Sequence, residues 1–181
     1  MRPTAGDPDV ALVVLLRGVN VGGHRTFRPA HLAKQLAHLE AVNIGAAGTF
    51  VIRKRVAQAR LRAELTRRLP FETEIMIVPG RTILSFVSRE PFAGQPVTRE
   101  IVWFVSVLGR RPRSAPSLPM TIPPKGPWDL KLIGREDRLL FGMYRRHMKA
   151  IGQLGTLDRL LGVPVTTRNW NTMTAIAKAL A

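Results

Sequence analysis

The chain of 181 residues contains no cysteine. Disulfide bonds, thiol nucleophiles and zinc–thiolate sites are therefore excluded, and the composition fits a reducing cytoplasm, where we expect the protein to reside. No apolar run approaches the roughly 20 residues of a membrane-spanning helix. Residues 1–9 lack the apolar centre of a signal peptide and are expected to form a disordered tail.

Catalytic and metal-binding patterns are also missing. The sequence contains no G-x-S-x-G, S-x-x-K or H-E-x-x-H motif, so no motif specifies an enzyme. His31 and His38 share one predicted helix face but stand two turns apart, roughly 10 Å along the axis, which is too far for one metal ion. The sequence therefore predicts no metal site and no cofactor.

Negative charge is scarce, because 12 Asp and Glu stand against 28 Lys and Arg, for a formal net charge of +16. This excess favours a polyanionic partner such as nucleic acid. The other interpretation is a coding bias, since 22 of the 28 basic residues are arginine in an alanine-rich chain. A nucleic-acid surface, if present, is expected at the densest basic cluster, which comprises Arg53, Lys54, Arg55, Arg60, Arg62, Arg67 and Arg68.

Hydrophobic patterning in the first part of the chain alternates between strands and helices. A continuous β-branched and leucine run predicts a buried strand at 10–18. Leucines at helical spacing predict helices at 29–40 and 56–69. Further strands are expected at 42–52, with a bulge or bend at Gly45 and Gly48, at 73–78 and at 100–108, and a short helix within 81–92. This order predicts an α+β fold with helices packed on one sheet.

The second part begins with a proline-rich stretch. Residues 110–127 contain six prolines and are expected to form an irregular crossing segment. A β-hairpin is predicted within 130–144, and a helix at 150–161 that ends at Gly162. The predicted organisation is a tail (1–9), an N-terminal α+β subdomain (10–109), the crossing segment (110–127), and a hairpin with helices packed on the first subdomain (128–181).

Two polar segments carry the main functional signal. The glycine-rich turn after the first strand fails to match a P-loop or a dinucleotide fingerprint, but its backbone N–H groups and Arg17 suit an anion. The other interpretation is that its glycines only permit a tight turn.

In TTRNWNTM, from Thr166, we predict Thr166 as N-cap of the last helix and a hydrophobic staple between Val165 and Trp170. The remaining polar side chains are those of Arg168, Asn169 and Asn171. They either bind an anion at the helix start or form hydrogen bonds to neighbouring loop carbonyls.

LLRGVNVGG near the start and TTRNWNT near the end together resemble the two signatures of the bacterial family of domain of unknown function 1697 (DUF1697). The resemblance implies two small α+β subdomains, the first ferredoxin-like with a mixed or antiparallel sheet, and no established activity. The chain departs from the family pattern at His24, at Ala47–Gly48–Thr49 and at YRRHMK (144–149).

Our leading hypothesis is an anionic or phosphorylated small ligand in a cleft between the glycine-rich turn and the start of the last helix. Nucleic-acid binding at the basic cluster is the competing hypothesis. The predicted ligand residues are Arg17, Gly18, Asn20, Gly22, Gly23, Arg168, Asn169, Trp170 and Asn171.

Overall fold

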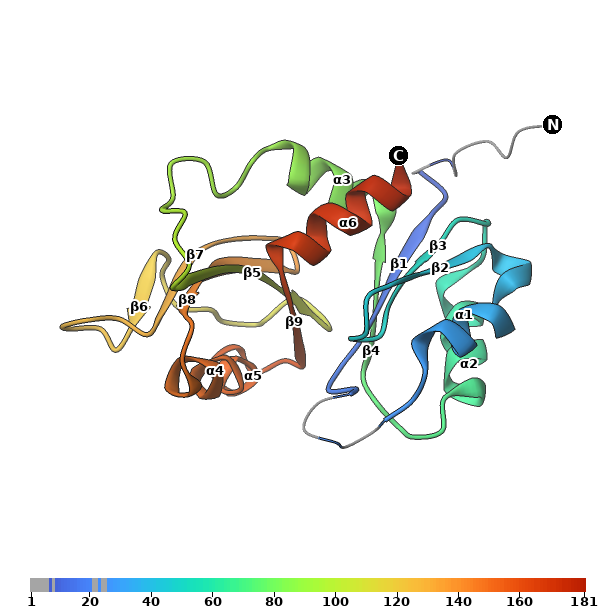
Figure 1. Cartoon of the computed structure of the whole chain (residues 1–181), viewed down its shortest axis with the longest axis horizontal. Coiled ribbons are helices and arrows are strands. Elements are labelled where there is room, and N and C mark those ends of the chain that lie inside the picture. Colours follow the sequence, from blue (N-terminus) through green and yellow to red (C-terminus); the bar gives the residue numbers. More distant parts are fainter. Residues whose placement is uncertain (1–6, 8, 21–22, 24–25) are drawn as a thin grey trace. The chain divides into compact units, whose positions relative to one another are not determined.

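The computed structural model describes residue 7, residues 9–20, residue 23 and residues 26–181. The chain divides into two compact units, each with its own sheet (Figure 1). Unit 1 comprises Met1–Arg89 and Asn171–Ala181, and unit 2 comprises Glu90–Trp170. The subdomain boundaries proposed from the sequence remain a prediction of domain organisation.

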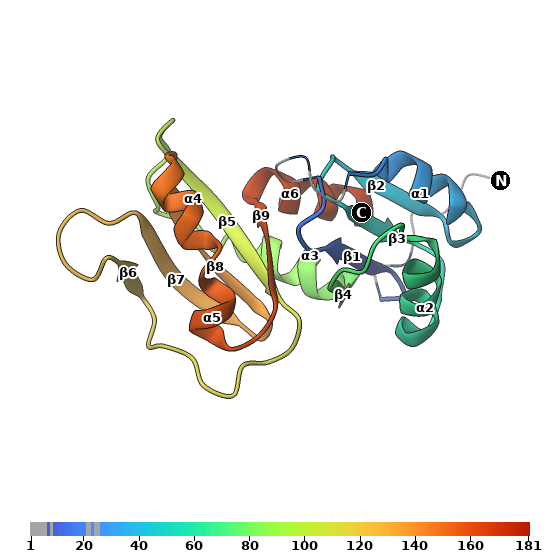
Figure 2. The same ribbon diagram turned by 90° about the horizontal axis from the view of Figure 1, so that it is seen from below.

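Unit 1 contains a four-stranded antiparallel sheet in the order β2-β3-β1-β4. Figures 1 and 2 show α1 and α2 on one face of this sheet and α3 and α6 on the other. The strand order and the succession βαββαβ are compatible with the ferredoxin-like arrangement that the family resemblance implies. The elements are β1 (Leu12–Leu16), α1 (Pro29–Gln35), the 3-10 helix η1 (Ala37–Leu39), β2 (Ala41–Ile44), β3 (Thr49–Ile52), α2 (Gln58–Arg68), β4 (Ile75–Pro79), α3 (Gly80–Ser88) and α6 (Trp170–Leu180).

The core of unit 1 lies between the sheet and helices α1 and α2. Strand β1 is buried along its whole length, as its uninterrupted apolar run predicts. Leu12, Val14 and Leu16 alternate toward the helices and join Leu61 and Leu65 of α2 in one apolar cluster. The leucine stripe of α2 is therefore what fixes this helix on the sheet.

The predicted strand at 42–52 is wrong in one respect, because it is a hairpin. Strands β2 and β3 pair antiparallel, with Ile44 opposite Thr49, and the glycines lie in the turn between them. Gly45 and Gly48 have φ values of 69° and 71°, which glycine adopts without strain. A Cβ on Gly48 would stand 2.7 Å from Val19 Cγ2, so this position also requires glycine for close packing.

Unit 2 contains a five-stranded antiparallel sheet in the order β6-β7-β8-β5-β9. Helices α4 and α5 lie on one face of it (Figures 1 and 2), where Leu157 and Leu161 join Phe104 and Leu132 in the core. The elements are β5 (Ile101–Leu108), β6 (Met120–Ile122), β7 (Leu130–Glu136), β8 (Leu139–Arg145), α4 (Met148–Leu154), α5 (Leu157–Leu161) and β9 (Val165–Asn169).

Two sequence-based expectations for unit 2 need correction. The proline-rich stretch 110–127 is not wholly irregular, because it contributes the edge strand β6, which pairs with β7 alone. The strand itself contains no proline, and Pro119 and Pro123 stand directly before and after it. The predicted helix at 150–161 is broken between Leu154 and Leu157 into α4 and α5, at a Gly155–Thr156 step.

Candidate functional site

The glycine-rich turn after β1 is closed by the side chain of Asn20. Its amide nitrogen donates to the carbonyl of Ala46 at 2.8 Å, and its oxygen accepts from the backbone N–H of Phe27 at 3.0 Å. Asn20 has φ 54°, a left-handed conformation that asparagine tolerates better than most residues. Gly18 and Gly23 are exposed with positive φ, and Gly22 lies outside the described residues. Asn20 therefore links the turn to the β2–β3 hairpin.

Arg17 lies beside an open groove of about 570 Å³, lined also by Gly18, Glu72, Thr73 and Glu74. Its backbone is held by the two residues before β4, because its N–H donates to the carbonyl of Glu74 and its carbonyl accepts from the Thr73 hydroxyl. Two carboxylates and one guanidinium line this groove. Its charge composition therefore does not favour an anion over a cation.

A second groove lies between the start of α1 and the end of α2, and we call it the α1–α2 groove. It has a volume of about 320 Å³. Every ionisable side chain among its lining residues is basic, and the remaining side chains are apolar apart from one amide. The lining residues are Phe27, Arg28, His31, Leu32, Gln35, Arg68, Leu69 and Pro70.

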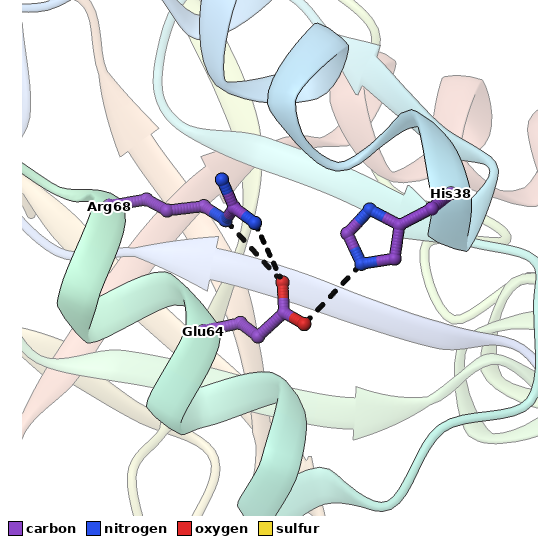
Figure 3. Close-up of polar contacts among 3 residues, drawn as sticks. All are labelled: His38, Glu64 and Arg68. Carbon is purple, nitrogen blue, oxygen red and sulfur yellow. Dashed lines mark hydrogen bonds and ion pairs between the residues drawn. The ribbon is translucent and has the colours of Figure 1, made fainter.

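Arg68, on the α2 side of this groove, is held by Glu64. Figure 3 shows the Glu64 carboxylate between Arg68 and His38. Its Oε2 lies 3.4 Å from both Nε and Nη2 of Arg68, and its Oε1 lies 3.3 Å from Nε2 of His38. Burial tends to raise the pKa of Glu64, but the hydrogen bonds and charges of His38 and Arg68 outweigh it and lower the pKa below 4.5. Glu64 is therefore an ionised anchor for Arg68 at neutral pH.

The second polar segment does not begin the last helix as predicted. Val165–Asn169 forms strand β9, which pairs with β5 from Phe104 to Leu108, and α6 begins only at Trp170. Thr166 is therefore not an N-cap, and Val165 and Trp170 do not hold the N′ and N4 positions of a staple. The β-branched run Val165–Thr167 favours a strand, and a partner strand supplies its hydrogen bonds.

Arg168 is a buried cation in this strand, with 6% of its surface exposed. Its Nη1 donates to the Thr166 hydroxyl at 2.8 Å and to the Thr167 carbonyl at 2.9 Å. Burial lowers the pKa of Arg168 from its ordinary value to about 10, so the guanidinium stays charged at neutral pH. The sequence left two roles for Arg168, binding an anion or hydrogen bonding to nearby backbone carbonyls, and the structure shows a hydrogen bond of the second kind.

The three residues after Arg168 differ in their surroundings. Asn169 and Asn171 are exposed, the first at the end of β9 and the second in the first turn of α6. Trp170 packs against Phe92, with ring centroids 5.0 Å apart, and Phe92 in turn stacks on Trp103. Trp170 belongs to unit 2 and Asn171 to unit 1, so the unit boundary falls inside the motif.

The predicted basic cluster is divided between structural and exposed side chains. Arg53 donates from Nε and Nη2 to the carbonyl of Ala179 in α6, and Arg62 donates to the carbonyl of Ile75. Arg68 holds Glu64. The members whose side chains lie exposed without such a described contact are Lys54, Arg55, Arg60 and Arg67.

The YRRHMK segment, where the chain departs from the family pattern, forms a further polar cluster in unit 2. His147 accepts the N–H of Ala150 on Nδ1 and so caps α4. Its Nε2 lies 3.3 Å from Oδ1 of Asp129, and Nζ of Lys149 lies 3.0 Å from Oδ2 of the same carboxylate. These contacts anchor the start of α4 to the segment before β7.

Sequence reasoning missed most of the α1–α2 groove. Arg28, His31 and Gln35 recur at spacings of three and four, which places them on one face around α1. That spacing is a usable signal for one wall. The second wall, at the end of α2, comes from the tertiary fold and has no local signal.

Two further features of the described residues concern metals and membranes. Within the described part of the chain, no cluster of three or more His, Asp or Glu side chains is arranged to hold a metal ion. Among the described helices, none is both long and apolar enough to cross a bilayer.

The fold and its grooves define a two-unit α+β protein with basic surface features. The sequence matches the family described as protein of unknown function (DUF1697) over residues 10–136. The chain therefore belongs to the DUF1697 family, and the matched residues include the first of the two motifs but not the second.

Comparison with solved structures gives the same fold. The conserved bacterial protein SP0830 from Streptococcus pneumoniae is similar, with a TM-score of 0.57 and 18% identity. The match covers 94% of this chain and 98% of that protein. No curated protein matches the chain.

Proposed function

We propose that this protein binds an anionic small ligand in the α1–α2 groove of unit 1. The observation that carries the proposal is the convergence of three basic side chains, Arg28, His31 and Arg68, on one groove of about 320 Å³. A groove of this size falls at the lower end of the range for small-molecule sites. Guanidinium groups are suited to phosphate and carboxylate because they offer paired N–H donors.

Arg68 is the central residue of the proposed site. A guanidinium carries five donor hydrogens, so Arg68 can hold Glu64 through its Nε and Nη2 edge and an anion through other donors. Because Glu64 fixes the side chain, less rotamer entropy is lost on binding. Arg68 is thereby prepared for a ligand before the ligand arrives.

The glycine-rich turn supports the proposed site from one side. Asn20 binds the backbone of Phe27, and Phe27 and Arg28 line the groove. The turn would then contribute to the site by holding Phe27 and Arg28 in position. None of the described residues that line this groove belongs to the remaining ligand residues predicted from the two motifs, for which a ligand role stays a prediction: Arg17, Gly18, Gly22, Gly23, Arg168, Asn169, Trp170 and Asn171.

Calorimetric titration at low salt with inorganic phosphate and pyrophosphate tests the proposal. We expect both to bind, and Arg68→Gln to weaken binding by roughly tenfold, the loss of one charge-assisted contact. Arg67→Gln is the matched control, because Arg67 is an exposed neighbour on α2 that does not line the groove. Equal affinities for the two variants would contradict the groove as the site.

Nucleic-acid binding is the second candidate, and the exposed Lys54, Arg55, Arg60 and Arg67 favour it. It predicts that affinity for a DNA or RNA oligonucleotide falls steeply as salt rises, because phosphate contacts release counterions. Replacing Arg60 and Arg67 together with glutamine should reduce that salt slope. A flat salt response, or no binding at low salt, would remove this candidate.

A further inference from the structure

Resting on the proposed function, we infer that the ligand of the α1–α2 groove carries an aromatic ring beside its anionic group. The chemical class is an aromatic or heteroaromatic phosphate monoester small enough for about 320 Å³. The ring lies against the apolar side of the groove and the phosphate against Arg28 and Arg68.

The apolar part of the groove is the first ground for this assignment. Leu32 and Leu69 are buried members of the unit 1 core, and Phe27 packs against that core from a partly exposed position. Together with Pro70 they line half of the groove. A purely inorganic anion would leave the exposed parts of Phe27 and Pro70 in water, whereas an aromatic ring would bury them and gain free energy from that burial.

The second ground is that Phe27 is held in place before any ligand binds. Its backbone N–H donates to Asn20, and its ring meets Phe71 edge to face at 5.7 Å between centroids and 84° between planes. Aromatic rings favour such edge-to-face or offset contacts. A fixed phenyl ring offers a ligand ring a contact surface at small entropic cost.

The polar part of the groove adds a preference for charge and for ring heteroatoms. The amide nitrogen of Gln35 lies 3.3 Å from Nε2 of His31. An amide and an imidazole offer both donors and acceptors, which suits the edge of a heteroaromatic ring. A negative group on the ligand would pair with Arg28 and with the donors of Arg68 that do not hold Glu64, whereas a neutral ring alone would not use these donors.

Titration of four probes tests the inference: inorganic phosphate, phenyl phosphate, phenol and a sugar phosphate such as glucose 6-phosphate. We expect phenyl phosphate to bind at least roughly tenfold more tightly than inorganic phosphate, from burial of one ring. The sugar phosphate should resemble inorganic phosphate, and phenol should not bind measurably.

Phe27→Leu separates the ring contact from the charge contact. It keeps an apolar side chain and both arginines, so we expect the affinity for phenyl phosphate to fall by a larger factor than the affinity for inorganic phosphate. In case this variant folds poorly, saturation-transfer NMR on the unaltered protein gives a second measurement. The ring protons of phenyl phosphate should receive saturation in the unaltered protein and lose it in Arg68→Gln, but not in Arg67→Gln.

The outcomes distinguish this inference from the proposed function. Equal affinity for inorganic and phenyl phosphate overturns the aromatic assignment and leaves anion binding intact. Failure of every anion to bind overturns both. Binding of phenyl phosphate that is unaffected by Arg68→Gln and Phe27→Leu places the ligand elsewhere and overturns the inference.

Discussion

Two arginines, Arg68 in unit 1 and Arg168 in unit 2, carry the same charge in opposite surroundings. Arg68 is partly exposed, is held by the carboxylate of Glu64, and lines a groove. Arg168 is buried in strand β9, and its guanidinium donates to a threonine hydroxyl and a backbone carbonyl. Of the two residues, Arg168 stands in the segment TTRNWNT, whereas Arg68 combines a groove with a partly exposed guanidinium.

The comparison shows that a distinctive motif can mark a structural requirement as easily as a binding site. A charged group in the interior must be hydrogen-bonded, so the sequence around it is constrained by the fold itself. A surface arginine is constrained only where it meets a ligand or a carboxylate. Stability and ligand affinity are therefore the two measurements that separate the roles of these residues.

The largest expected effect is the destabilisation caused by Arg168→Ala. The variant leaves the acceptors on Thr166 and Thr167 without this donor and opens a cavity in unit 2, for a cost of about 3 kcal/mol. Urea denaturation measures this cost. Asn169→Ala, on the exposed end of the same strand, should change stability by less than about 0.5 kcal/mol.

The same two variants also test whether Arg168 has a structural role. If Arg168→Ala kept its stability and lost its affinity for phosphate, Arg168 would be a ligand residue, as the motif first suggested, and the distinction drawn from burial would fail.

The elements with strong local signals could be predicted from the sequence. Strand β1 is a continuous apolar run, and leucine recurs every fourth residue at Leu61 and Leu65 of α2 and at Leu69, directly after the helix. Both patterns show which side chains are buried, and each can be recognised within a short stretch of sequence. The α+β class and the family membership follow from the same local features together with the two motifs.

The errors arise where a residue suits two structures. Gly45 and Gly48 are compatible with a bulge or with a turn, and only the pairing of β2 with β3 decides for the turn. Threonine is common both at helix N-caps and in strands, and at Thr166 the pairing of β9 with β5 determines that the segment is a strand. The α1–α2 groove joins residues from two helices, so its location depends on contacts that no local pattern contains.

Asn20→Ala, in the first motif, is expected to have an intermediate effect on stability. It removes the bonds to Ala46 and Phe27 and leaves alanine at φ 54°, for a cost of about 1–2 kcal/mol. Asn20→Gly is the control that separates the terms, because glycine keeps the conformation while losing the hydrogen bonds.

Phosphate affinity of the folded Asn20→Ala protein should fall only a few-fold, through the displaced wall at Phe27 and Arg28. Complete loss of binding with full retention of stability would instead make Asn20 a direct ligand contact.

The smallest expected effect is that of Glu64→Gln on the pH dependence of stability. The folded-state pKa of Glu64 is lowered below 4.5, so its ionised form stabilises the native state above that value. This contribution is lost as the pH falls through the lower, folded-state pKa. Because the ion pair with Arg68 is partly exposed, we expect a difference below about 1 kcal/mol at pH 6.

Urea denaturation of both proteins at pH 6 and pH 3 measures the Glu64→Gln effect, with Glu72→Gln as an exposed control. The stability gap between unaltered protein and Glu64→Gln should narrow at pH 3, while that of the control should change less. A gap that stays constant or widens toward acid would show that Glu64 is not an ionised anchor. Arg68 would then not be a surface arginine held by an ionised carboxylate, and its contrast with the buried Arg168 would no longer hold.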